Sequence, residues 1–238
     1  MLRYRASRRE LVAAGIKAPP VLYAAMRWLA HAINRFMWHV EITAPWEVPE
    51  HGPVILAPVH RSFLDFFVAS EATARPVAFM AKSELWRSKL LGRFLAAFGA
   101  FPVNRSGVDR KALERSEEVL SAGAVLVVFP EGERKTGPEI EKLLDGVVFL
   151  ATRTGAAIVP IGLAPTERVM PKGTKLPKRM PVQLVLGRCL DGRDGSGGAR
   201  VRRAEILQKT ALLRRSLQDA FDEARALAGE TGALAGDG

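Results

Sequence analysis

Cysteine is nearly absent from this chain of 238 residues, and Cys189 is the only one. A single cysteine excludes an internal disulfide framework and a zinc cluster built on cysteine pairs, and it fits a reducing compartment. Cys189 lies in an apolar run, so we expect it in the core. The sequence also lacks a group of residues with metal-ligand spacing, so we expect no metal.

Acidic residues are outnumbered, with 25 Asp and Glu against 35 Lys and Arg, which gives a formal net charge of +10 and a pI near 10.2. This charge favours an anionic partner, such as nucleic acid, acidic lipid or a phosphorylated substrate. The sequence has no nucleic-acid motif with interleaved aromatic residues. The hypothesis of a non-catalytic basic module that binds nucleic acid or membrane is therefore supported by the charge alone.

Long uninterrupted apolar runs are also missing. The arginine-rich N-terminus precedes a short apolar stretch at residues 11–16, which is broken at Lys17 and Pro19. No small-residue cleavage site follows, so we exclude a signal peptide. We expect three parts: a basic, amphipathic helical segment over residues 1–45, an α/β domain over 46–228 and a disordered tail over 229–238.

Apolar runs alternate with helical patterns along the chain. This alternation predicts an α/β fold with a mostly parallel central sheet flanked by helices. We expect strands at 54–57, 77–80, 100–103, 125–129, 157–163 and 182–186, and helices over 63–73, 83–98, 109–122, 140–152 and 201–227. Ser83 is the expected cap of the second of these helices.

Residues 21–39 form an unusual helical pattern. Arg27, His31, Arg35 and His39 recur every fourth residue in one stripe, and most other positions are apolar. The stripe argues against a single membrane span. A helix that lies in the membrane interface, with its arginines towards lipid phosphates, fits this pattern. A helix that covers the core of a soluble domain is the alternative.

A histidine and an aspartate follow the first expected strand. His60 lies in a short loop, and Asp65 falls in the first turn of the next helix, three residues after the N-cap candidate Ser62. A carboxylate bonded to one imidazole nitrogen fixes the tautomer and leaves the other nitrogen free to accept a proton. The alternative is an ordinary loop histidine beside a capping aspartate.

Three further polar segments are expected as loops after strands, where ligands bind in open α/β sheets. They are residues 101–105, 129–135 and 159–162. Gly132 permits a positive φ or a close approach of a ligand. Arg105, Arg134 and Lys135 supply positive charge that suits a phosphate. Glu131 is alternatively the ion-pair partner of a neighbouring arginine.

Four motifs occur in order: His-x4-Asp at His60, Phe-Pro-x-x-Arg at residues 101–105, Phe-Pro-Glu-Gly-x-Arg at 129–134 and Val-Pro-Ile-Gly at 159–162. This order resembles the glycerolipid acyltransferases, most closely the 1-acylglycerol-3-phosphate acyltransferases. Residues 81–85, which contain Lys82, look like the lysine-containing segment of that family.

The resemblance implies that His60 is the general base and that Asp65 orients it. It implies an acyl thioester of coenzyme A or acyl carrier protein as donor, lysophosphatidic acid as acceptor, and no further cofactor. The residues that it assigns to substrate binding are Lys82, Arg105, Glu131, Gly132, Arg134 and Lys135. The fourth motif would shape the acyl or acceptor pocket. The implied location is peripheral or interfacial, on the bilayer at the cytoplasmic face of the membrane, with no nucleic acid as partner.

Departures from the family pattern leave the acceptor open. Val59 stands where the family usually has asparagine, and Glu133 and Lys135 replace a threonine and a serine. The segment 58–62 is similar to the glycerol-3-phosphate acyltransferase branch. Glycerol-3-phosphate, another lysolipid or a polyol is therefore the alternative acceptor, and a thioesterase would use water with the same base. Glu133 beside a phosphate pocket is unfavourable unless it pairs with Arg134 or Lys135.

Overall fold

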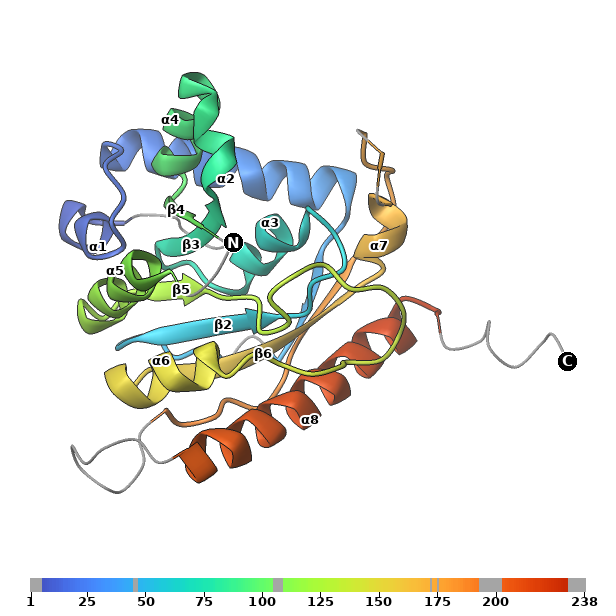
Figure 1. Cartoon of the computed structure of the whole chain (residues 1–238). Coiled ribbons are helices and arrows are strands. Elements are labelled where there is room, and N and C mark those ends of the chain that lie inside the picture. The colour runs from blue at the N-terminus through green and yellow to red at the C-terminus, as the bar shows by residue number, and fades with distance from the viewer. Residues whose placement is uncertain are drawn as a thin grey trace, which may run out of the picture.

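The computed structural model describes residues 6–44, 47–104, 109–171, 173–174, 176–192 and 203–230. It confirms the α/β prediction, with one seven-stranded sheet in the order β1-β7-β6-β2-β5-β3-β4 (Figure 1). Neighbouring strands pair in parallel except β6 and β7. The strands are β1 (Glu41–Thr43), β2 (Val54–Pro58), β3 (Val77–Lys82), β4 (Ala100–Val103), β5 (Val125–Val127), β6 (Ala157–Ala164) and β7 (Gln183–Leu186).

Helices cover both faces of the sheet. Figure 1 shows α2 and α3 on one face and α5, α6 and α8 on the other, and α8 packs along β6 and β7. Helix α4 packs against β4, at the edge of the sheet. The α-helices are α1 (Arg8–Ala13), α2 (Pro20–Met37), α3 (Asp65–Ala69), α4 (Lys89–Ala97), α5 (Arg110–Ser121), α6 (Gly146–Thr154), α7 (Thr166–Val169) and α8 (Arg203–Leu227). The 3-10 helix η2 (Ser70–Ala72) follows α3, and the 3-10 helix η3 (Ser83–Arg87) follows β3.

The two strands at the centre of the sheet explain where polar groups can gather. Every residue of β2 and β5 is buried, as their continuous apolar sequences predict for parallel strands covered on both faces. Strand β2 lies between β5 and β6, and both pair with it in parallel. The segments that leave β2, β5 and β6 therefore emerge side by side at the carboxyl edge of the sheet.

The N-terminal segment is built into this fold. Strand β1 pairs with β7, and Leu11, Ile16 and Tyr23 lie in the same hydrophobic core as the central strands. The expected boundary between residues 45 and 46 therefore has no counterpart in the sheet. In the expected tail, Gly229 and Glu230 are described, whereas residues 231–238 lie outside the described residues.

Helix α2 confirms the helical pattern of residues 21–39, but its polarity differs from the expected one. The guanidinium of Arg27 is buried and donates to the carbonyls of Ser70 and Thr73, at 2.8 and 3.1 Å. His31 and Asn34 both bond the buried carboxylate of Glu71. The first half of the polar stripe therefore faces the domain, so the expectation that Arg27 points towards lipid phosphates is wrong, whereas Arg35 is exposed.

The outward face of α2 is apolar instead. Its exposed large apolar side chains are Val21, Leu22, Trp28, Leu29, Ile33 and Phe36, and Arg35 is exposed beside Phe36. Among the described residues, no helix has both the length and the apolar character needed to cross a membrane.

Two helices begin later than the sequence predicts. Ser83 starts the 3-10 helix η3, and α4 begins at Lys89, where the Ser88 hydroxyl accepts a hydrogen bond from the Leu91 amide. Helix α6 begins at Gly146 rather than at residue 140. Ile140 is nevertheless buried, with its amide bonded to the side chain of Gln218. The apolar residues before Gly146 are therefore part of a buried loop and not of a helix.

The Val-Pro-Ile-Gly motif lies inside β6 and not in a loop, which corrects its expected position. All four residues are buried between β2 and β7. A Cβ atom at Gly162 would overlap the backbone carbonyl of Ala220 in α8. Glycine at this position lets α8 lie directly on the sheet, so the motif supports packing at the centre of the fold.

We expect Gly162→Ala to lower the free energy of unfolding by about 1–3 kcal/mol, because the added methyl forces α8 away from β6. Urea unfolding measures the change. Gly146→Ala is the matched control, since nothing lies within 4 Å of a Cβ atom at that position. Equal stability of the two variants would contradict this role of Gly162.

Candidate active site

His60 is held where β2 ends. The amide of Val59 still donates to the carbonyl of Ile161 in β6, at 3.0 Å, so the histidine follows the last paired residue. Its Nδ1 lies 3.0 Å from Oδ2 of Asp65, whose side chain is fully buried. The structure therefore brings together the two residues that the sequence predicts as a base and its partner.

The same oxygen of Asp65 organises the whole turn. Oδ2 accepts the backbone amides of Arg61 and Ser62, at 2.6 and 2.7 Å. An ionised carboxylate only accepts hydrogen bonds, so its partner is the Nδ1–H tautomer of His60, and in that tautomer Nε2 is the nitrogen that can take a proton. Asp65 supplies one half of the predicted capping box. The Ser62 hydroxyl instead accepts the Leu64 amide.

Neither the serine nor the cysteine near these segments is a nucleophile. The Ser62 hydroxyl is buried and donates to the carbonyl of Met170, at 3.3 Å. Burial, followed by the charges of Glu47 and Asp191, raises the pKa of the Cys189 thiol, which keeps it protonated. The site therefore offers a base but no covalent nucleophile of its own.

Phe129 fixes the plane of the imidazole. The two rings stack with their centroids 3.9 Å apart and an interplanar angle of 23°. The His60 side chain is only 11% exposed, so the ring is clamped between the aspartate and the phenylalanine. No role was predicted for Phe129 from the sequence. Its position as the first residue of the Phe-Pro-Glu-Gly motif is the feature that could have indicated a contact with the site.

Arg61 and Glu131 form a buried ion pair behind the histidine. The guanidinium Nη1 lies 2.7 Å from Oε1 of Glu131, and both side chains are almost completely buried. Oε2 of Glu131 also accepts the backbone amide of His60, at 2.8 Å. Glu131 thus forms the ion pair with a neighbouring arginine that was the alternative to substrate binding, and it also bonds the backbone of His60.

Arg61 also contacts the loop that follows Glu131 and helix α8. Its Nε and Nη2 donate to the carbonyls of Gly137 and Glu139, at 3.1 Å each, and its Cζ lies 4.9 Å from the ring centroid of Phe221 in α8. No role was predicted for Arg61 from the sequence. Its position next to His60, together with the glutamate of the later Phe-Pro-Glu-Gly motif, could have indicated an ion pair between the two segments.

Of the remaining predicted residues, Gly132 and Arg134 lie in the loop that follows β5, and Lys82 ends β3. Gly132 has a φ of +75°, as its predicted turn requires, and Arg134 is exposed in the same loop. Lys82 is exposed at the end of β3. Arg105, which follows β4, lies outside the described residues.

Lys135 connects this loop to His60 through its backbone. Its amide donates to the carbonyl of His60, at 2.8 Å. Its ammonium pairs with Glu133 at 3.1 Å and with Glu141 at 3.2 Å, and these bonds raise the pKa of Lys135. Glu133 therefore has the ion-pair partner that the sequence analysis required for a carboxylate in this loop.

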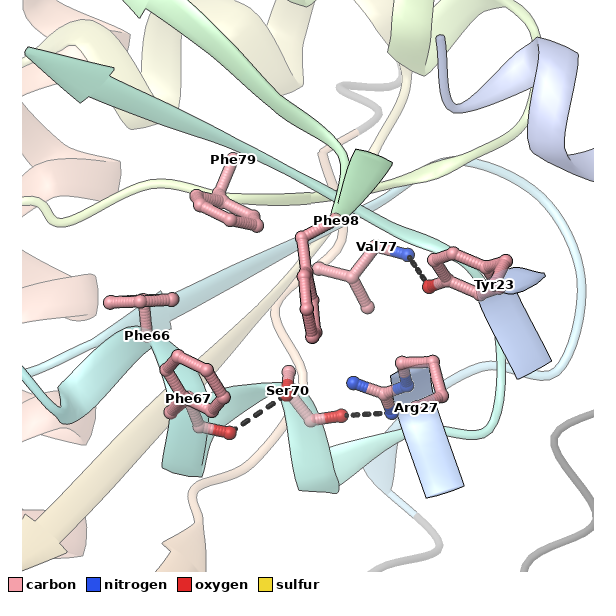
Figure 2. A pocket seen from close by; sticks show the side chains of 8 residues that line it. All are labelled: Tyr23, Arg27, Phe66, Phe67, Ser70, Val77, Phe79 and Phe98. Carbon is pink, nitrogen blue, oxygen red and sulfur yellow. Dashed lines mark hydrogen bonds between the residues drawn. The ribbon is translucent and has the colours of Figure 1, made fainter. Parts of the chain in front are cut away.

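An aromatic pocket lies on the face of the sheet behind Asp65 (Figure 2). Helix α2 contributes Tyr23 and Arg27, and the amide of Val77 donates to the Tyr23 hydroxyl, whose pKa is raised by burial. The lining phenylalanines are Phe66, Phe67, Phe79 and Phe98. Its free volume is about 10 Å³, room for a single water, so the aromatic rings fill the space between α2 and the sheet.

An oriented imidazole at the carboxyl edge of a parallel sheet is an arrangement that suits general-base chemistry on an α/β fold. The acyltransferase family model matches residues 39–164, which include the histidine turn, the Phe-Pro-Glu-Gly loop and β6. The chain belongs to the acyltransferase family.

Several relatives carry the name 1-acyl-sn-glycerol-3-phosphate acyltransferase. A chloroplastic one from Arabidopsis thaliana is 28% identical over 64% of this chain and 43% of its own length, and one from Chlamydomonas reinhardtii is 30% identical over 66% and 51%. One from Bacillus subtilis is 26% identical over 62% and 71%. The chain therefore spans about half the length of the first two relatives.

A solved structure shows the same fold. The 1-acyl-sn-glycerophosphate (LPA) acyltransferase PlsC from Thermotoga maritima superposes with a TM-score of 0.71 over 91% of this chain and 87% of its own. The sequence identity is 17%, so this likeness concerns the fold.

Proposed function

We propose that this protein transfers an acyl group from a thioester to the free hydroxyl of 1-acylglycerol-3-phosphate and so forms phosphatidic acid for phospholipid biosynthesis. The observation that carries this proposal is the His60–Asp65 pair, which is oriented and has Nε2 left to accept a proton. The names of the relatives support the lysophosphatidic acid acceptor.

The reaction needs two proton transfers, to and from His60, and one substitution at the thioester carbonyl. Nε2 of His60 takes the proton of the acceptor hydroxyl as its oxygen attacks the thioester carbonyl. The new C–O bond forms, the C–S bond breaks, and the imidazolium returns its proton to the leaving thiolate. The buried Asp65 carboxylate stabilises the imidazolium in between. A thioester is already activated, so the proposal requires neither a cofactor nor a metal, and the donor is acyl-coenzyme A or acyl carrier protein.

The phosphate of the acceptor needs cations beside this base. In the described residues, Arg134 and Lys82 are exposed cations at the carboxyl ends of β5 and β3. We assign the phosphate to them together with Arg105. Lys135 is already held by two carboxylates, and Glu131 acts on the His60 amide. Gly132 supplies the turn that aims Arg134.

The apolar outward face of α2 supports a peripheral position on the bilayer. We propose that this face enters the interface at the cytoplasmic side of the membrane, where the acceptor lipid resides. Trp28 and Phe36 are exposed on it, and aromatic rings of this kind favour the headgroup region.

An acceptor panel tests the proposed function. Thiol release from palmitoyl-coenzyme A is measured with lysophosphatidic acid, glycerol-3-phosphate, a lysophosphatidylcholine or no acceptor. We expect stimulation by lysophosphatidic acid alone.

Stimulation by glycerol-3-phosphate would move the function to the branch indicated by Val59 and Lys135. Thiol release that ignores every acceptor would indicate a thioesterase. No release at all would direct the assay to acyl carrier protein as donor.

A further inference from the structure

Helix α4 carries a second apolar surface that nothing in the described part of the chain covers. Leu90 is 82% exposed and Phe94 is 49% exposed, and they lie one turn apart on the same face. Leu91, at 39%, lies beside them. The opposite face of α4 holds the buried Leu95 and Gly92, which packs on Trp86. The helix is therefore anchored by one side and presents leucine and phenylalanine on the other.

Basic residues surround this apolar surface. Lys82, Arg87, Lys89 and Arg93 are all exposed, and Glu84 is the only acidic residue between Lys82 and Asn104. No ion pair joins any of these four cations to a carboxylate of the described residues. The apolar stripe thus lies inside a rim of positive charge.

Helix α4 is linked to α2 through packed aromatic rings. The rings of Phe94 and Phe98 lie 5.0 Å apart, and those of Phe98 and Phe67 lie 5.7 Å apart. Phe98 and Phe67 line the pocket whose other wall is α2, and Figure 1 shows α2 and α4 at the same end of the molecule, beyond the sheet. The two exposed apolar faces therefore belong to helices with a fixed mutual position.

The two helices differ in charge. Arg27 of α2 points into the domain, which leaves Arg35 as the exposed arginine of that helix, whereas η3 and α4 place Arg87, Lys89 and Arg93 on the surface. We propose that α4 is a second docking element, which inserts Leu90, Leu91 and Phe94 into an anionic bilayer and places Arg87, Lys89 and Arg93 on its lipid phosphates. In this arrangement α2 contributes apolar contact with any bilayer, and α4 supplies the selectivity for anionic lipid.

Charge complementarity favours a bilayer over a second copy of the chain. A twofold contact through α4 would place two identical basic rims against each other, and like charges at close range repel. A bilayer with acidic headgroups accepts the leucine and phenylalanine side chains and neutralises the rim. Membrane docking at this site is compatible with the proposed acyl transfer but does not depend on the acceptor.

Vesicle sedimentation of the full chain tests the assignment. Vesicles of phosphatidylcholine are compared with vesicles that also contain phosphatidylglycerol. For the triple variant Arg87→Gln/Lys89→Gln/Arg93→Gln, we expect affinity for the anionic vesicles to fall about a hundredfold, since each cation near such a surface contributes roughly fivefold. Binding to pure phosphatidylcholine should stay unchanged. The variant Leu90→Ser/Phe94→Ser should weaken binding to both.

The matched control removes the same charge from the other face of the sheet, by Lys142→Gln/Arg203→Gln/Arg215→Gln at exposed positions. An equal loss in this control would mean that net charge alone drives binding and would overturn the proposal. Undiminished anionic binding of the α4 charge variant would also overturn it. So would a dimer in light scattering that Leu90→Ser/Phe94→Ser dissociates. None of these readouts uses the acceptor panel, so failure of the proposed reaction is recognised separately.

Discussion

The variant His60→Ala is expected to lose acyl transfer by about a thousandfold or more, within the range found for a positioned general base. The fold should persist, because the substitution leaves the backbone amide of residue 60 on Glu131 and its carbonyl on the amide of Lys135. Steady-state thiol release and urea unfolding measure the two properties. Vesicle binding should also be unchanged, since α2 and α4 are untouched.

His51→Ala is the matched control, because His51 is exposed in a loop before β2 and its loss should leave turnover unaltered. The variant Asp65→Asn tests the other member of the His60–Asp65 pair. It keeps the volume and an oxygen for the amides of Arg61 and Ser62, but it removes the charge that stabilises an imidazolium. Full turnover in His60→Ala, or unfolding of that variant, would contradict the assignment of His60 as the base.

The largest expected loss of stability comes from the buried ion pair. Arg61→Met leaves the Glu131 carboxylate buried without its counterion, and breaking a buried pair in this way costs about 3–5 kcal/mol. The free energy of unfolding in urea measures the loss. Activity should fall as well, because Glu131 holds the amide of His60.

A double variant separates charge from packing. Arg61→Met/Glu131→Gln keeps an oxygen for the His60 amide and removes the unpaired charge, so it should be more stable than Arg61→Met alone. Arg115→Met is the control, since its pair with Glu118 is equally short but exposed and should change stability by roughly 1 kcal/mol or less. A double variant no more stable than the single one would refute the charge argument.

Local patterns predicted the parts of this molecule that depend on near neighbours in the chain. The apolar runs of β2, β3, β4 and β6 begin at the predicted residues, and Asp109 caps α5 where a helix was expected. The bond between His60 and Asp65 spans five residues within one turn, and the motifs that follow the pair in the sequence, rather than its spacing alone, indicated it. Gly132 adopts the positive φ that its motif indicated.

Interactions between distant segments were beyond such patterns. The Arg61–Glu131 pair joins residues 70 positions apart, and only the sheet order brings β2 and β5 together. The direction of the α2 stripe depended on Glu71, a buried carboxylate that a helical period cannot reveal. Ile140 and Leu143 are buried at a helix-like spacing, although residues 140–143 are not helical. The substrate-binding assignments remain predictions.

The turn from His60 to Asp65 has a consequence for the energy barrier of the proposed reaction. One carboxylate oxygen holds two backbone amides and the imidazole, and Glu131 and Lys135 hold the amide and the carbonyl of the histidine. The base is thus aligned before any ligand arrives. Dipoles that are fixed during folding do not have to reorient when charge develops in the transition state, so little reorganisation energy is added to each turnover.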